Sequence, residues 1–557
     1  MDHLLDRRLG APLVVIFSCL ALILAGCSSA LAAPRPVFAF PAVAAKAQAM
    51  ARHERLRVAL DAAATRVGKA LGALAAATPA SSSPLAAAAR EDCAELLDEA
   101  LQLLAGAGAP GAARRDALTW LSAALTNHDT CADSLAEAGA PLHAHLAAAR
   151  GVVRDSLAMY ASTAAEAATA TTTTGAGGAG GLVMGEERSG KNETKRRGPC
   201  GFPRRQPVRD RRLLLAPAAA LAASADIVVA KDGTGTHATI ADAVKAAPEC
   251  SERRTVIHVK EGRYDENVKV GMKKTNLLFV GDGKGVTVVA GNRSVADNYT
   301  TFRTATFAAS GFGFMMRDMT VENWAGPAGH QAVALRVSAD RAVVHRCSIA
   351  GYQDTLYAHS NRQFYRDCDI YGTVDFVFGN AAAVLQRCNL WARVPLPGQK
   401  NTVTAQSRND SCQRTGIVLH ACRLVAAAPA EGLSPAAAPA PVPDRSPLLL
   451  SPTTYLGRPW KSFSRVVVMM SYIGPHVPPQ GWMEWNATST YALDRLYFGE
   501  YMNYGPGAGL AGRVAWPGHR VINSTAEAES FTVARFIDGA SWLPAAGVSF
   551  VAGLSLL

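Results

Sequence analysis

The 557-residue sequence divides into parts according to what each part lacks: β-strand patterns are nearly absent from one part, and helical patterns from another. From about residue 50 to 162 there is almost no β-strand pattern, which excludes a sheet there. Residues 163–225 are low in complexity and have no means of burying a core. From Asp226 onward, short β-rich runs follow one another without helical patterns between them. We therefore expect two domains joined by a linker.

Residues 1–33 have the pattern of a targeting segment. Arg7 and Arg8 precede the apolar run "APLVVIFSCLALILAG", and small residues follow through Ala33. This order is typical of a cleaved secretory signal peptide, while the length of the apolar run leaves an uncleaved signal anchor open. Both predict a secreted protein, and N-glycosylation sequons such as "NRS" and "NYT" agree with that compartment.

The formal net charge of the chain is +11. A basic secreted protein favours polyanionic partners such as an acidic polysaccharide, although solubility alone also accounts for the charge.

Residues 50–162 are rich in Ala and Leu, with apolar residues at helical spacing, which predicts a small bundle of antiparallel helices. Cys93 and Cys131 fall on two of these helices and could join them by a disulfide. The linker that follows contains "RDRRLLLAP", in which Arg211 and Arg212 are typical of a site for a basic-specific processing protease. An unprocessed charged linker is the alternative.

Residues 226–557 contain a regular repeat of short β-rich runs. The runs "VVHRCSI", "QFYRDCDI" and "AVLQRCNL" align Cys347, Cys368 and Cys388 in successive copies of the repeat. Short strands repeated in this way, without helices between them, predict a solenoid in which each turn stacks on the last. The expected fold is an all-β parallel β-helix preceded by an all-α helical bundle.

Stacking of the repeats places equivalent residues one above another at the strand spacing of ~4.8 Å. Cys347 and Cys368 then have Cα atoms within disulfide range, so we expect a disulfide between them, with stacked buried thiols as the alternative. Ile349, Ile370 and Leu390 would form an apolar ladder inside the coil.

Two aspartates occupy the same slot in successive repeats. Asp354 in "GYQDTLY" follows Cys347 at the same spacing as Asp375, in "YGTVDFVFG", follows Cys368. Carboxylates one strand spacing apart repel, so the pKa of one should rise. A neutral acid beside an ionised one suits acid–base and nucleophilic chemistry. Capping of turns is the structural alternative.

Further polar residues fall near the aspartates in the same register. Gln331 precedes Gln353 by about one repeat, and two amides on adjacent turns could donate to a developing oxyanion. Arg458, in "LGRPW", could bind a carboxylate in a bidentate manner and hold it ionised.

The residues "GHQAVALRVSADRAVVHRCSIAGYQDTLYAHSNRQFYRDCDIYGTVDFVFGNAA" and "YLGRPW" resemble plant pectin methylesterases, as do "EGRYDENV", "GPGA" and "WLPAAGV". The resemblance runs from about Asp226 to the C-terminus. The segment containing "TWLSAALTNHDTC" is similar to the inhibitor-like pro-region that precedes many of these enzymes. The family implies a right-handed parallel β-helix that removes methyl esters from the galacturonate units of pectin, with neither a metal nor an organic cofactor.

The resemblance also implies roles for single residues. Asp375 corresponds to the nucleophile that attacks the methyl-ester carbonyl, and Asp354 to the acid that protonates the departing methoxide and then activates water. Gln331 and Gln353 correspond to the oxyanion donors. The resemblance further implies that Arg458 orients Asp375, and that Trp460 and Trp482 line the sugar cleft.

The resemblance implies that the partner is pectin in the plant cell wall. A processing protease and a proteinaceous pectinesterase inhibitor are further expected partners, and no nucleic acid is expected. One departure concerns the pro-region: the family has an additional disulfide-bearing hairpin there, whereas no cysteine lies between Cys27 and Cys93. Whether this pro-region inhibits the enzyme is therefore open.

Two other functions compete with the esterase. A β-helical glycosidase could use the same carboxyl pair, but it has no carbonyl oxyanion that the two glutamines would stabilise. A non-catalytic pectin-binding or inhibitor protein is the second alternative, and the intact set of acids, amides and Arg458 disfavours it.

Overall fold

The computed structural model describes residues 41–76, 83–141, 144–172, 216–427, 452–486 and 490–555. The predicted targeting segment 1–33 and the basic site at Arg211 and Arg212 lie outside these ranges. Within them, no helix is both long and apolar enough to cross a membrane.

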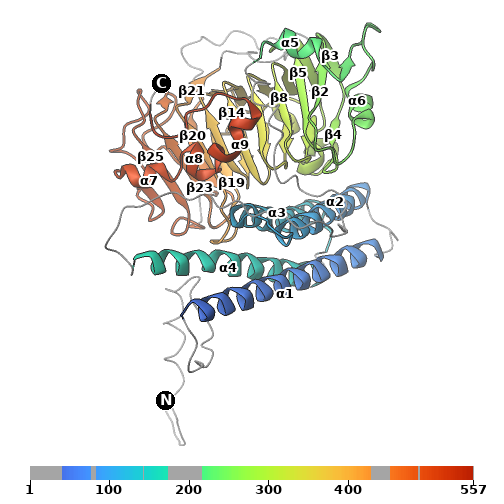
Figure 1. Cartoon of the computed structure of the whole chain (residues 1–557). Helices are drawn as coiled ribbons and strands as arrows, with labels where there is room; N and C mark the ends of the chain where they lie inside the picture. Colours follow the sequence, from blue (N-terminus) through green and yellow to red (C-terminus); the bar gives the residue numbers. More distant parts are fainter. Residues whose placement is uncertain are drawn as a thin grey trace, which may run out of the picture.

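The C-terminal part of the chain is a right-handed parallel β-helix, as predicted, built from three sheets in which every strand pair is parallel (Figure 1). Sheet A contains β1 (Ile227–Val229), β2 (Thr255–Val259), β5 (Leu277–Gly281), β8 (Met315–Arg317), β11 (Ala342–His345), β14 (Arg362–Arg366), β17 (Ala382–Gln386), β20 (Gly416–His420), β23 (Arg465–Met469), β25 (Tyr497–Tyr501) and β26 (His519–Val521).

Sheet B contains β3 (Gly262–Asp265), β6 (Thr287–Gly291), β9 (Thr320–Asn323), β12 (Ser348–Ala350), β15 (Asp369–Gly372), β18 (Asn389–Ala392), β21 (Arg423–Ala426) and β24 (Tyr472–Ile473). Sheet C contains β4 (Val268–Val270), β7 (Phe307–Ala309), β10 (Leu335–Val337), β13 (Leu356–Ala358), β16 (Val377–Gly379), β19 (Asn401–Gln406) and β22 (Thr454–Pro459). In the central part of the coil each turn adds one strand to each sheet, so residues one repeat apart are neighbours in space.

The interior of the β-helix is filled by ladders of apolar side chains. Ile349 of β12 pairs with Ile370 of β15, which pairs with Leu390 of β18, and all three are buried. The predicted ladder is therefore confirmed. In the described part of the chain, five short α-helices flank the coil: α5 (Ala218–Ala223), α6 (Ile240–Ala246), α7 (Thr525–Glu529), α8 (Val533–Phe536) and α9 (Gly539–Ala546).

The predicted disulfide between Cys347 and Cys368 is wrong, because both side chains are free thiols. They form a buried stack with Cys388 and Cys422. Equivalent residues on parallel strands project their Cβ atoms in the same direction about one strand spacing apart, ~4.8 Å, whereas a disulfide requires a Cβ separation of roughly 3.8 Å. Each thiol instead donates to a backbone carbonyl, as Cys347 does to His345, and burial raises the pKa of Cys347.

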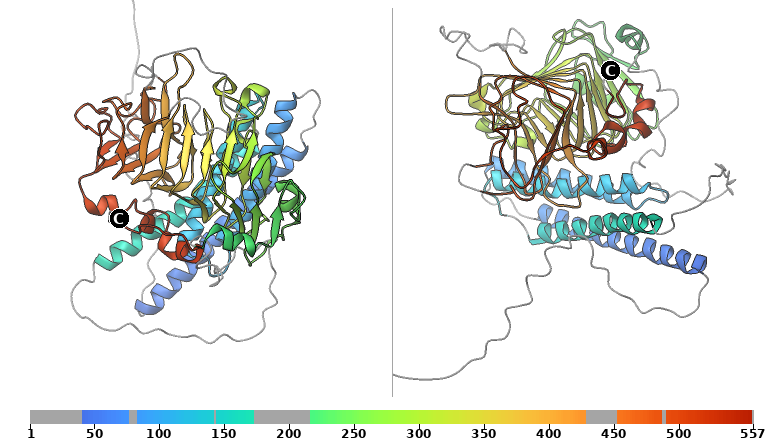
Figure 2. Two further views of the ribbon diagram at one scale, coloured as in Figure 1. Left: turned by 90° about the horizontal axis from the view of Figure 1, so that it is seen from above. Right: turned by 90° about the vertical axis from the view of Figure 1, so that its left-hand side faces the viewer.

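The N-terminal part of the described chain is a bundle of four helices: α1 (Pro41–Ala76), α2 (Pro84–Ala107), α3 (Arg114–Glu137) and α4 (Ala144–Thr172). Helix α2 begins where the side chain of Ser83 accepts a hydrogen bond from the Ala86 N–H, with Pro84 in the first helical position. Figures 1 and 2 show two layers, with α2 and α3 against the β-helix and with α1 and α4 on the far side of them.

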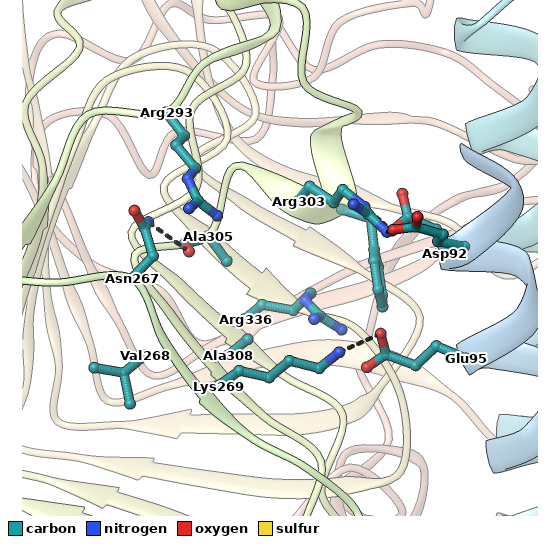
Figure 3. A pocket seen from close by; sticks show the side chains of 12 residues that line it. Asp92, Glu95, Asn267, Val268, Lys269, Arg293, Arg303, Ala305, Ala308 and Arg336 are labelled. Atoms are coloured by element: carbon teal, nitrogen blue, oxygen red, sulfur yellow. Dashed lines mark hydrogen bonds and ion pairs between the residues drawn. The ribbon is translucent and has the colours of Figure 1, made fainter. Parts of the chain in front are cut away.

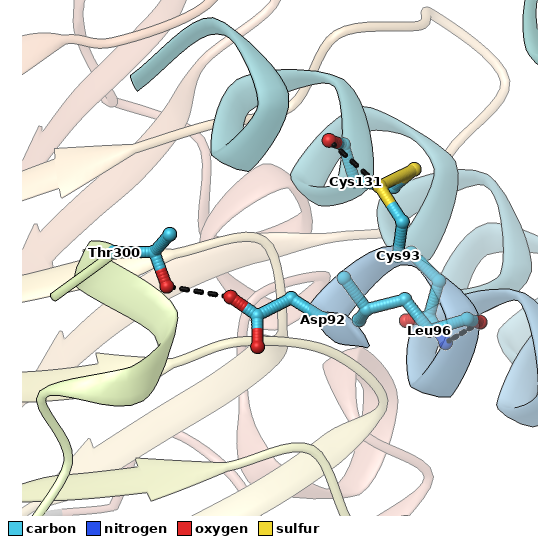
Figure 4. Close-up of a disulfide and its surroundings, with 6 residues drawn as sticks. Asp92, Cys93, Leu96, Cys131 and Thr300 are labelled. Carbon is cyan, nitrogen blue, oxygen red and sulfur yellow. Dashed lines mark hydrogen bonds between the residues drawn. A yellow bond between two sulfur atoms is a disulfide. The ribbon is translucent and has the colours of Figure 1, made fainter. Parts of the chain in front are cut away.

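The predicted disulfide between Cys93 and Cys131 is present and joins α2 to α3 (Figure 4). It closes a separation of 38 residues, and a loop of that size corresponds to about 4 kcal/mol of lost chain entropy in the unfolded state. The adjacent Asp92 accepts a hydrogen bond from Thr300 of the β-helix. The disulfide therefore fixes the two helices that contact the β-helix.

Thiol mapping tests which cysteines are free and which are joined in a disulfide. When the unreduced protein is denatured and alkylated, Cys347, Cys368 and Cys388 should each carry the label, because they enter the reaction as free thiols. Cys93 and Cys131 should take it only after reduction. A linked peptide containing Cys347 and Cys368 would contradict the structure.

Candidate active site

A cavity of about 190 Å³ lies over the outer face of sheet C, where α3 meets the β-helix. It is lined by all five residues predicted to be catalytic: Asp354, Asp375, Gln331, Gln353 and Arg458. Apart from the adjacent Gln353 and Asp354, these residues are separated in the sequence by 20 residues or more, and the stacked turns bring them to one place.

The two aspartates have equivalent positions on successive turns. Asp354 lies two residues before Leu356, and Asp375 two residues before Val377, and these two partners pair directly between β13 and β16. Both aspartates have left-handed backbone conformations, with φ of 62° and 52°. Asp tolerates this region better than most residues with a Cβ, and such conformations concentrate at functional sites.

Asp375 is held from two sides. Arg458, on β22, donates from Nε to Oδ1 (2.8 Å) and from Nη2 to Oδ2 (2.6 Å), which is a bidentate contact. The hydroxyl of Thr402 donates to Oδ1 (2.5 Å) and accepts from the Asp375 N–H (2.8 Å). Oδ1 therefore accepts two hydrogen bonds, and Oδ2 accepts one.

Asp354 is in a different electrostatic environment. Burial is the largest effect that raises its pKa well above the usual value, and the charge of Asp375 adds to it. The charge of Arg458 acts in the opposite direction, and Glu137 of α3 raises the pKa further. The site thus contains one carboxyl group that favours its protonated form beside another that is paired with a guanidinium, which is the division of roles that the register predicted.

Aromatic side chains form one wall of the cavity. Tyr357 and Phe378 stack with ring centroids 4.2 Å apart, and Phe378 contacts Trp460 at 6.0 Å. Arg458 lies 4.4 Å from the ring of Trp485. Flat apolar rings of this kind suit the faces of sugar units, with which they can make extensive contact.

The structure corrects the placement of Trp482. This side chain is 1% exposed, stacks on Phe498 inside the β-helix and donates from Nε1 to Glu500. It therefore cannot line the cleft, and Trp485, three residues later, lies there instead. Sequence reasoning also missed Thr402, for which the stacking of β19 on β16 was the available signal.

Comparisons with known proteins decide which family this is. Residues 226–540 match the model of the Pectinesterase family, and residues 25–170 match that of the plant invertase/pectin methylesterase inhibitor family. The chain belongs to the pectinesterase family. It is 52% identical to a probable pectinesterase/pectinesterase inhibitor 34 from Arabidopsis thaliana over 85% of this chain and 75% of that protein.

A second Arabidopsis thaliana relative, probable pectinesterase/pectinesterase inhibitor 61, is 49% identical over 90% of this chain and 82% of its own length. Among solved structures, pectin methylesterase from carrot is 50% identical, with a TM-score of 0.54, and the match covers 59% of this chain and 98% of that one. The match spans nearly the whole carrot chain and 59% of this one, so that structure is a folded pectin methylesterase chain of about the extent of the β-helix.

In this pectinesterase the helical bundle closes the cavity. Thr130, Asp133, Ser134 and Glu137 of α3 complete its lining. Asp133 is 2.7 Å from the ammonium group of Lys461. The apolar cluster of the bundle extends without interruption onto the aromatic wall of the cleft. Helix α3 thus covers Asp354 and Asp375, which are 7% and 5% exposed.

Buried acids at this interface make the closed state sensitive to pH. Burial, together with the nearby Glu95, raises the pKa of Glu99 on α2 to about 7, although Ser310, Arg336 and Lys269 of the β-helix oppose the rise. Closing takes up a proton to the extent that burial of Glu99 against the β-helix, rather than its surroundings within the bundle, raises this pKa. Closure is therefore favoured as the pH falls below about 7 towards the ordinary value of 4.5.

We expect the methanol release of the full chain, relative to that of the isolated pectinesterase domain, to increase between pH 5 and pH 7 and then level off. In the Glu99→Gln variant the group stays neutral, so the relative activity should be lower at pH 7 and should depend less on pH. Asp98→Asn, on the same helix, is the control. A Glu99→Gln profile that coincides with that of the wild type would show that this carboxyl group does not control closure.

Proposed function

We propose that Asp375 is the nucleophile and Asp354 the acid–base group of this pectinesterase, which hydrolyses methyl esters of galacturonate units in pectin. The activity follows from the family. The assignment of roles rests on one observation: two carboxyl groups in equivalent positions differ, since Arg458 binds one in a bidentate manner and burial raises the pKa of the other.

In the first half of the reaction, an oxygen of Asp375 attacks the ester carbonyl carbon. Oδ2 is the better candidate, because it accepts one hydrogen bond whereas Oδ1 accepts two. The amides of Gln331 and Gln353 donate to the oxygen that becomes negative. The tetrahedral intermediate then expels methoxide, which takes the proton of Asp354 and leaves as methanol. An acyl anhydride with Asp375 remains.

In the second half, Asp354 is ionised and accepts a proton from water. The resulting hydroxide attacks the acyl carbon, and the bond to Asp375 breaks. This step releases a galacturonic acid unit, whose carboxyl group then loses its proton to solvent, regenerates the Asp375 carboxylate and leaves Asp354 protonated for the next ester. Trp460 and Trp485, with Tyr357 and Phe378, hold the sugar chain across the site.

We further infer that the chain is secreted and acts in the plant cell wall. Residues 1–33 direct it into the secretory pathway, and a basic-specific protease cleaves after Arg212 to separate the two domains. The match of residues 25–170 to the inhibitor family supports this arrangement. A separate proteinaceous inhibitor of that family would bind the same cleft and would compete with the docked bundle.

Substitution of the nucleophile tests the mechanism. In the isolated pectinesterase domain, Asp375→Asn should reduce methanol release from methyl-esterified pectin by about 10⁴-fold or more, because the neutral amide cannot attack the ester. Binding of the same pectin should change little, since the aromatic wall is intact.

Asp265→Asn, an exposed position on β3, is the matched control and should retain full activity. If Asp375→Asn kept more than a few per cent of the activity, Asp375 would not be the nucleophile.

A further inference from the structure

A single row of outward-facing residues crosses all seven strands of sheet C. Each residue of the row pairs with the next through the parallel ladder: Lys269, Ala308, Arg336, Tyr357, Phe378, Ala405 and Arg458. Arg458 is the cation of the catalytic cavity, while Arg336 lies four strands away, or about 19 Å at ~4.8 Å per strand. The row therefore continues beyond the catalytic site and ends in further cations.

A second cavity, of about 310 Å³, lies over the far end of this row (Figure 3). Four cationic side chains line it: Lys269, Arg293, Arg303 and Arg336. Phe302 lines both this cavity and the catalytic one. The two cavities are thus neighbouring sections of one surface, the first with the aspartate pair and the second with a cluster of positive charge.

Arg336 is the most deeply placed of these cations. It is 3% exposed, and its guanidinium lies 3.4 Å from the ring centroid of Phe302. Its Nε has no hydrogen-bond partner among the described residues. In Figure 3 the side chains of Lys269 and Arg336 extend from the strands towards α2. A buried guanidinium with an unused donor is suited to an anionic ligand.

Acidic side chains of α2 occupy the opening of this second cavity. Arg303 is bound by Glu91 (2.8 Å) and by Asp92, and Lys269 is bound by Glu95 (2.5 Å). Glu91 and Glu95 are one helical turn apart and thus lie on the same face of α2. This face presents a series of carboxylates to the cationic end of the row.

We propose that Lys269, Arg303 and Arg336 form a binding subsite for de-esterified, carboxylate-bearing galacturonan, and that the acids of α2 occupy it while the bundle is docked. The proposal rests on the proposed function, because the reaction converts neutral esters into carboxylates. A pectin chain lying along the row places its ester at the aspartate pair and its existing carboxylates on the cations. The enzyme then keeps hold of the stretch that it has already de-esterified.

The experiment uses the isolated pectinesterase domain, residues 226–557, and fully methyl-esterified oligomers as substrate. De-esterified galacturonan oligomers, short or long, are added as inhibitors, and the inhibition constant is obtained from methanol release. Lys269→Gln/Arg303→Gln is the test variant, because both side chains are at the surface and Arg336 stays in place. Lys231→Gln/Arg535→Gln removes the same charge outside sheet C and is the control.

We expect long de-esterified oligomers to inhibit the wild type and the control more strongly than short ones do, since only long oligomers reach the second cavity. The test variant should bind long oligomers about tenfold more weakly, with a smaller dependence on salt, as expected when two ionic contacts are lost. Inhibition constants within twofold of the control would overturn the proposal and leave the cations a role in docking α2 alone. Absence of methanol from the wild type would instead refute the proposed function.

Discussion

The register between successive turns of the β-helix is the constraint on which the site depends. Parallel pairing of β13 with β16 holds Leu356 opposite Val377, and the aspartates two residues earlier share one slot for that reason. Parallel pairing of β19 with β22 likewise places Arg458 within reach of Asp375. Because every turn is hydrogen-bonded to the next, a shift of one residue would displace the whole constellation.

Electrostatics links the catalytic site to the domain that covers it. Burial and the charge of Asp375 raise the pKa of Asp354, which favours the form that donates a proton, and α3 adds Glu137 to the same cavity. On the adjacent part of the surface, cations of the β-helix face acids of α2. The bundle therefore does more than cover the site sterically. The acids of α2 are complementary in charge to the cationic surface of the β-helix, which we propose binds an acidic polymer.

Much of this arrangement could be predicted from the sequence, because a regular repeat of short strands specifies which residues stack. That reasoning identified Asp354, Asp375 and the interior ladder. It failed for the Cys347–Cys368 pair, since stacking points the two Cβ atoms in the same direction about one strand spacing apart, which is too far for a disulfide. The family resemblance, by contrast, misplaced Trp482 in "GWMEW", because Trp485 follows three residues later and no periodic pattern distinguishes a buried ring from a cleft ring in a loop. The docking of α3 depends on tertiary contacts that no local pattern contains.

The split between the two carboxyl groups is the central claim, and a site-resolved titration tests it most directly. Carbon-13 NMR of the Asp354 carboxyl group in the isolated pectinesterase domain should give a pKa above the ordinary value of 3.8. Replacement of Asp375 by Asn should lower that pKa, because it removes the neighbouring negative charge and frees the charge of Arg458. An ordinary pKa for Asp354, unchanged by the replacement, would contradict the account.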